Sequence, residues 1–476
     1  MEIKELRKSR RALDRFVAQF DDCIKTKPSR QHLRTYVNGQ LGPLKRKSVE
    51  PIALDAGVPP RTLQEFLGIH RWDDLAVARR LRELVQRDHA DENAIGVIDE
   101  TSFAKKGNRT AGVQRQHCGA TGKTDNCVVT VHLGYAAKNF HTLIDGDLYL
   151  PKESWSENRE RCRAAGIPDD VQYRPKWRIA LDLLQRSLDD GVQLRWLTAD
   201  EEYGRVREFR DTVSAWGLNY VVEVPSCLSG WTQMPEIEPT GTVVASGRKL
   251  TKPRIAPGAK VACQVSKLWP RGGPSWQTYR IKDTEKGPVV WEVRETRFYP
   301  NYDGIPGPDH RLLVAREVLT GEVKYFLSAA SPAVPLAILL FVAFSRWRIE
   351  RLFEDGKGQI GLDHFEVRNY RSLQRHLLLS ILSLYFLCEQ ADRLRKKKSV
   401  VVAPSGEGGR RGATRSLHAT ARADTAPGES RHQDQLLATD SGRGGILSRQ
   451  TQTLGVTSSW RRSSKSTTMS DANLAL

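Results

Sequence analysis

The stretch Ala94-Ile-Gly-Val-Ile-Asp99-Glu-Thr-Ser-Phe103 is a short apolar run that ends in an acid. A central, buried strand of an α/β sheet presents this pattern at its carboxyl end. The stretch Leu194-Arg-Trp-Leu-Thr-Ala-Asp200 repeats the pattern later in the chain. The two runs predict neighbouring strands, with Asp99 and Asp200 side by side at one edge of the sheet.

The segments around these two runs predict a mixed α/β sheet. Their order is three strands, a helix, a strand, a helix and a strand. The segment 143–150 is either the third strand or a tight hairpin, and we expect Asp145 and Asp147 to be turn residues because Asp-Gly-Asp favours turns. The predicted strands are 94–99, 127–135, 143–150, 194–200 and 218–224, and the predicted helices are 176–189 and 204–216.

Residues 225–328 change to short β-like pieces separated by glycine and proline, which predicts a β-rich insertion after the first part of the core at 94–224. The insertion carries four tryptophans, and packing in a core is the more frequent use of such residues than stacking on bases. The predicted pieces are 241–245, 260–265, 288–293, 311–315 and 322–327, and the tryptophans are Trp231, Trp269, Trp276 and Trp291.

A helical pattern returns at 329–397 and contains Arg346-Trp-Arg-Ile-Glu350-Arg-Leu-Phe-Glu-Asp-Gly-Lys357. On a helical wheel, Arg346, Glu350 and Lys357 fall within about 40° of one another, beside an apolar arc. A carboxylate in this position could hold a metal ion against a phosphate. The same spacing also occurs in surface helices with ordinary ion pairs.

Residues 1–93 show helical periodicity and predict a helical N-terminal domain. Within it, 48–67 has the outline of two short helices joined at Gly57, as in a helix-turn-helix. Arg61 would then face outward from the second helix. This pattern is typical both of a helix-turn-helix that reads DNA and of a helical hairpin with a purely structural role.

Composition narrows the class of protein. The chain has 476 residues and a formal net charge of +18, which favours a polyanionic partner such as nucleic acid. Seven scattered cysteines without a paired motif indicate neither a zinc site nor a disulfide framework, as in a reducing cytosol. The apolar runs 333–344 and 377–387 are too short to cross a bilayer, so we expect buried helices and no membrane association. Residues 398–476 have low complexity and predict disorder, and their abrupt start suggests a shift of reading frame.

These segments together resemble the DDE transposases of bacterial insertion sequences, which have an RNase H-like catalytic core. The resemblance is carried by 97–107, 112–119, 197–204 and 346–357 and spans most of residues 1–390. One branch of that family has a Tyr-Arg-Glu-Lys signature around its glutamate and a β-type insertion before it. Arg346 and Lys357 match the signature, whereas Ala343 stands where the tyrosine is expected.

The resemblance implies that Asp99, Asp200 and Glu350 are catalytic and bind two Mg²⁺ ions, with Mn²⁺ as a substitute. It implies cleavage at the ends of a mobile element and strand transfer into target DNA, by a homodimer on double-stranded DNA in the bacterial cytoplasm, at the nucleoid. A decayed DNA-binding copy and a nuclease of the same fold are the alternatives. The expected DNA contacts are Arg346, Lys357, Lys105, Lys106, Arg368, Arg371 and Arg61.

Overall fold

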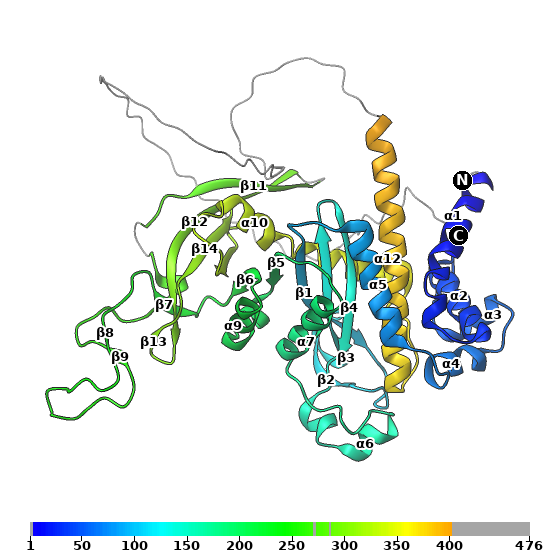
Figure 1. The fold of residues 1–476 in the computed structure, drawn as a ribbon, viewed down its shortest axis with the longest axis horizontal. Helices are drawn as coiled ribbons and strands as arrows, with labels where there is room; N and C mark the ends of the chain where they lie inside the picture. The colour runs from blue at the N-terminus through cyan, green and yellow to red at the C-terminus, as the bar shows by residue number, and fades with distance from the viewer. Residues whose placement is uncertain (1–2, 270–272, 285–286, 402–476) are drawn as a thin grey trace, which may run out of the picture. The chain divides into compact units, whose positions relative to one another are not determined.

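The structure is a computed structural model, and it describes residues 3–269, 273–284 and 287–401, all within one compact unit. A mixed sheet of thirteen strands runs through this unit (Figure 1). Most of the predicted tail at 398–476 lies outside the described residues. Its first residues, up to Val401, continue the last helix.

The first part of the sheet has the strand order of an RNase H-like core, β4-β3-β1-β5-β6. Strands β1, β3 and β4 are antiparallel neighbours, and β5 and β6 are parallel to β1. The fold class expected from the sequence is therefore confirmed. The strands are β1 (Ile95–Ala104), β2 (Gln114–Cys118), β3 (Lys123–Ala137), β4 (Phe140–Leu148), β5 (Trp196–Ala199) and β6 (Asn219–Val224).

The β-rich insertion extends this sheet, because β15 pairs antiparallel with the outer edge of β6. Two expected pieces are wrong: 241–245 contributes only an isolated bridge at Val243, and 260–265 only two strand residues. Glycine and proline are frequent around both pieces, which limits regular pairing. The insertion has β7 (Ser229–Trp231), β8 (Ile237–Glu238), β9 (Arg254–Ile255), β10 (Cys263–Gln264), β11 (Gln277–Thr284), β12 (Gly287–Tyr302), β13 (Ile305–Pro306), β14 (His310–Glu317) and β15 (Val323–Ser328).

Helices cover both faces of the core strands. Helix α10 packs on β5 and β6, α11 packs on β1 and β4, and α7 packs on β3 and β4. The predicted helix at 204–216 begins three residues late, at Arg207, because Gly204 is the last residue of a separate short helix. A Cβ at Gly204 would overlap the carbonyl oxygen of Glu223, so only glycine allows this short helix to lie so close to β6. The helices of this region are α6 (Arg159–Ala164), α7 (Lys176–Asp189), α8 (Glu201–Gly204), α9 (Arg207–Ala215), α10 (Leu336–Phe344), α11 (Trp347–Asp355) and α12 (Tyr370–Val401).

The N-terminal residues form the expected helices, and these pack against α12. The Tyr36 hydroxyl lies 2.8 Å from His376 Nδ1, and Gln40 Nε2 donates to Ser380 Oγ at 2.7 Å, both in buried positions. The helix-turn-helix outline is present in α3 and α4, with Gly57 in the left-handed region at their turn. The helices are α1 (Ile3–Ala18), α2 (Lys27–Leu41), α3 (Val49–Asp55), α4 (Pro60–Gly68) and α5 (Asp74–His89).

The apolar runs 333–344 and 377–387 fall largely in two helices whose apolar side chains are mostly buried, α10 and α12. Among the described residues, no helix is both long and apolar enough to cross a bilayer. Each of the seven cysteines is within the described residues and has a free thiol. Trp231 and Trp291 are buried, while Trp269 and Trp276 are partly buried against the core.

Candidate active site

Strands β1 and β5 bring Asp99 and Asp200 to the same edge of the sheet. The two strands are parallel, and Ile98 and Ala199 form their last pair. Asp99 is the next residue of β1, and Asp200 follows β5 as the N-cap of α8, where its carboxylate accepts from Glu202 N at 3.0 Å. The predicted juxtaposition of the two acids is therefore present.

Glu350 approaches this edge from α11. The apolar side of α11 is buried, and Ile349 packs on the sheet beside Gly134. The Glu350 side chain lies on the other side of the helix and is 52% exposed. Helix α10 ends before α11 begins, and Ala343, at the position of the missing tyrosine, is buried in α10.

Arg346, the N-cap of α11, joins the acids. Its Nη1 donates to Asp99 Oδ2 at 2.9 Å, and its Nη2 lies 2.7 Å from Glu350 Oε1. The helical wheel correctly placed Arg346 beside Glu350. Lys357 lies beyond the end of α11, in a wide turn at Gly356–Ile360, and its Nζ donates to the Ser102 carbonyl at 3.4 Å. Lys357 therefore contacts β1 from this turn, and not from the helix that the helical wheel assumed.

Burial dominates the electrostatics of the two aspartates. It raises the pKa of Asp99 to about 7, against the opposing effect of Arg346, and Asp200 and Glu100 add to the rise. Burial also raises the pKa of Asp200, again with a contribution from Glu100. The acids thus lack enough neighbouring positive charge to hold their pKa values in the ordinary range.

Glu100 points to the opposite face from Asp99, as strand alternation predicted. Its carboxylate pairs with Lys176 Nζ at 2.6 Å and accepts from the Tyr203 hydroxyl at 2.7 Å. Sequence reasoning missed both partners. Lys176 begins a predicted helix and Tyr203 follows a predicted strand. Nothing in their sequence positions indicates that both contact the Glu100 carboxylate.

The other predicted DNA contacts are dispersed. Lys105 Nζ donates to the Phe365 carbonyl at 2.8 Å and lies over the Phe365 ring, and burial lowers its pKa to about 8. Arg61 lies on α4 and pairs with Glu65 at 2.7 Å. The structure therefore brings only Arg346 and Lys357 close to β1 near Asp99. Three further residues of this set are exposed: Lys106, Arg368 and Arg371.

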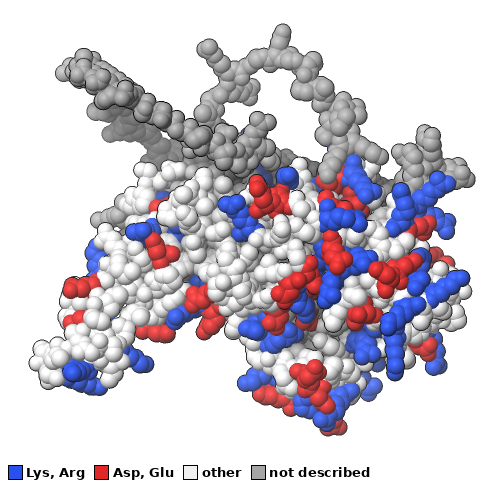
Figure 2. Space-filling model, in the orientation of Figure 1, with Lys and Arg blue, Asp and Glu red and all other residues white. Residues whose placement is uncertain are grey.

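Basic residues are not confined to this site. In Figure 2, lysine and arginine side chains gather over the N-terminal helices and are mixed with acids, whereas much of the insertion is uncharged in this view. The N-terminal helices therefore carry many exposed charges of both signs on this face.

Asp145 and Asp147 are strand residues of β4 and not turn residues, so that prediction is wrong. Both are buried beside arginines: Arg82 and Arg186 each lie 3.1 Å from Asp145, and Arg174 lies 2.9 Å from Asp147. These arginines supply the charge that lets a carboxylate occupy a buried strand.

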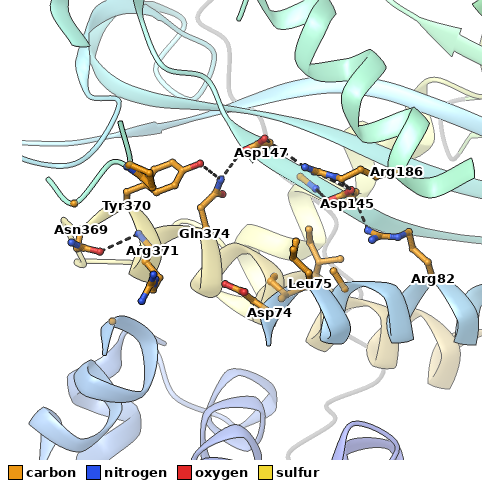
Figure 3. A pocket seen from close by; sticks show the side chains of 17 residues that line it. Asp74, Leu75, Arg82, Asp145, Asp147, Arg186, Asn369, Tyr370, Arg371 and Gln374 are labelled. Atoms are coloured by element: carbon orange, nitrogen blue, oxygen red, sulfur yellow. Dashed lines mark hydrogen bonds and ion pairs between the residues drawn. The ribbon is translucent and has the colours of Figure 1, made fainter. Parts of the chain in front are cut away.

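The two aspartates line a pocket of about 510 Å³ (Figure 3). Between them in β4, Gly146 lies against His132, the cross-strand partner of Asp99. Because side chains alternate along a strand, the pocket lies on the opposite face of the sheet from Asp99. Its own acids already have arginine partners.

A sequence profile described as DDE superfamily endonuclease matches residues 19–288, more than half of the chain. The chain belongs to this family. The matched segment includes Asp99 and Asp200 and ends before Glu350, so the position of Glu350 depends on the structure.

One curated protein that is similar to this chain is described as a probable transposase for insertion sequence element IS701, from Microchaete diplosiphon. It is 33% identical over 193 residues, which are 40% of this chain and 47% of the relative. The match therefore spans about half the length of that relative.

Membership of the family implies a divalent metal ion as cofactor. The donor types fit, because Asp99, Asp200 and Glu350 offer the carboxylate oxygens that hard cations prefer. The three carboxylates do not yet lie close enough together to share one ion. Among the described residues, no group of three His, Cys, Asp or Glu side chains is placed to hold a metal ion. Arg346 lies between two of the acids instead.

Proposed function

We propose that this protein is a transposase that cuts DNA at the ends of an insertion sequence and joins the freed ends to target DNA. The observation that carries the proposal is the convergence of Asp99, Asp200 and Glu350, from three distant segments, on one edge of an RNase H-like sheet. The description of the curated relative as a probable transposase supports it.

In this proposal Asp99, Asp200 and Glu350 hold two Mg²⁺ ions, for which Mn²⁺ can substitute. When bound, divalent ions supply Lewis-acid stabilisation of the attacking and leaving oxygens. Asp99 and Asp200 are fixed by rigid strand ends, and Glu350 is fixed by a helix packed on the same sheet. Such fixed ligands suit in-line attack on a phosphodiester, first by water and then by a DNA 3′-hydroxyl.

Cations of the chain position the DNA in this scheme. Arg346 and Lys357 contact phosphate near the scissile bond, with Lys106, Arg368 and Arg371 as further contacts, whereas Lys105 keeps its contact with Phe365. The N-terminal helices, with Arg61 on α4, bind the element ends. Because two ends have to be joined, two copies of the chain act together on double-stranded DNA, at the nucleoid in the cytoplasm.

The test is cleavage and joining of a labelled DNA fragment that carries the element ends, with Mg²⁺ or Mn²⁺. We expect Asp99→Asn, Asp200→Asn and Glu350→Gln each to lower the rate at least about 1000-fold, because each removes a metal ligand, while DNA binding persists. Glu354→Gln is the matched control, because Glu354 lies on the same helix and pairs with Arg351.

Three results would contradict the proposal. Activity in the triad variants equal to wild type would exclude the assigned ligands. Cutting without joining would make the protein a nuclease of the same fold. Binding of the ends by wild type without any product would make this copy a DNA-binding protein that has lost its chemistry.

A further inference from the structure

Arg346 is the cation shared by the candidate metal ligands, whereas the nearby Glu223 has its own partner in Lys324 at 3.2 Å. Its guanidinium contacts Asp99 and Glu350 directly. Burial acts to lower its pKa, but Asp99 and Glu350, with smaller effects of Glu223 and Asp200, raise it overall. Asp99 and Glu223 belong to β1 and β6, Asp200 follows β5, and Glu350 belongs to α11.

The contacts of Arg346 use the oxygens that the proposed metal site requires. Nη1 occupies Asp99 Oδ2, and Nη2 occupies Glu350 Oε1. A guanidinium is permanently charged and planar, and it can bridge two carboxylates that would otherwise repel each other. A divalent ion placed between the same acids would be repelled by this guanidinium. The metal and Arg346 therefore compete for one position.

We propose that Arg346 is an internal counterion that holds Asp99 and Glu350 in place until a metal ion displaces it, and that the displaced guanidinium then binds a DNA phosphate. The inference rests on the proposed function, because it takes Asp99 and Glu350 as metal ligands. Arg346 is a positioning residue in this role: it acts through the acids before the metal arrives.

Displacement links metal binding to DNA binding. Without DNA, a metal ion has to break the ion pairs of Arg346, and the displaced guanidinium keeps only the weaker attraction of Glu223 and Asp200. A phosphate at the site offers the guanidinium a bidentate partner and lowers the cost of leaving the acids. DNA therefore increases the affinity for metal, and by linkage metal increases the affinity for DNA.

The first test measures Mn²⁺ affinity by titration calorimetry on the full-length protein without DNA. We expect Arg346→Met to bind Mn²⁺ about tenfold more tightly than wild type, the size of a typical coupling between two sites. Arg346→Lys keeps the charge and should stay near the wild-type value. Arg351→Met is the matched control on the same helix, since Arg351 pairs with Glu354 and Asp355, and we expect no change.

The direction of this effect separates the inference from a merely structural role, because loss of a structural residue would weaken metal binding. Unchanged or weaker Mn²⁺ binding in Arg346→Met would overturn the inference and leave the proposed function intact if the triad variants are still inactive. Failure of wild type and Arg346→Met alike to bind Mn²⁺ would overturn both.

A second test uses wild-type protein and does not depend on the folding of a variant. Mn²⁺ affinity is measured with and without a short duplex that carries an element end, with phosphorothioate at the scissile position to slow cleavage. We expect the duplex to tighten Mn²⁺ binding about tenfold in wild type and by less in Arg346→Met. Equal tightening in both proteins would overturn the inference.

Discussion

The two faces of the core sheet carry buried acids in opposite states of charge balance. On the pocket face, Asp145 pairs with both Arg82 and Arg186, and Asp147 pairs with Arg174. On the active-site face, Asp99 and Glu350 share Arg346. The difference separates two kinds of acid. An acid whose charge is balanced by its own arginines stabilises the fold. An acid that shares one arginine with a second acid is suited to bind a cation from solution.

Removing one arginine from each face would test this comparison most strongly. We expect Arg82→Met to lower the free energy of unfolding by about 3 kcal/mol, because Arg82 is 4% exposed and bridges two largely buried acids, and its loss leaves Asp145 and Asp190 with only the more exposed Arg186 and Arg79. Arg346→Met should cost about 1 kcal/mol, because Glu350 is half exposed and Asp99, whose pKa is raised to about 7, can take up a proton. Urea unfolding without divalent metal measures both, and equal losses would contradict the contrast between the faces.

A smaller effect is expected from the pH dependence of stability at Asp99. Its pKa is raised from 3.8 to about 7 in the folded protein. The folded state therefore keeps a proton that the unfolded chain releases, and wild type loses stability as pH rises through this window. Asp99→Asn has no such charge to bury, so its advantage over wild type should grow by on the order of 2 kcal/mol between pH 5 and pH 8.

Unfolding of both proteins in urea at the two pH values, with EDTA present, measures this difference. Asp145→Asn is the comparison from the pocket face, where removal of a fully paired acid should destabilise the protein at both pH values. If the stability difference between wild type and Asp99→Asn is the same at pH 5 and pH 8, the pKa of Asp99 is not raised in the folded protein and the prediction is wrong.

The smallest expected effect separates two adjacent lysines. Lys106 is exposed, whereas the ammonium of Lys105 is buried against Phe365. We expect Lys106→Met to weaken DNA binding severalfold and to reduce the slope of log affinity against log salt by about 1. Lys105→Met should leave that slope unchanged. A reduced slope in Lys105→Met would show that Lys105 leaves Phe365 to reach phosphate.

Periodicity correctly placed the acids at one edge of the sheet because strand ends and helix stripes are local patterns. Asp99, Asp200 and the neighbouring pair Arg346 and Glu350 were all placed by such patterns. The Asp145 prediction failed because local turn preference was overridden by arginines from elements distant in sequence. The contact of Lys357 with β1 was missed because a helical wheel assumes one continuous helix, and the wide turn after Asp355 breaks that assumption.

The packing of α2 against α12 has a consequence for how the protein is made. Tyr36 and Gln40 find their buried partners in His376, Ser380 and Ser383, which are synthesised some 340 positions later. Closing so long a loop is slow, and a ribosome has to deliver nearly all of the described chain before it can happen. A nascent chain stopped within the insertion would lack both Glu350 and the support for its N-terminal helices. Interrupted translation of this protein would therefore yield fragments that lack one of the three proposed metal ligands.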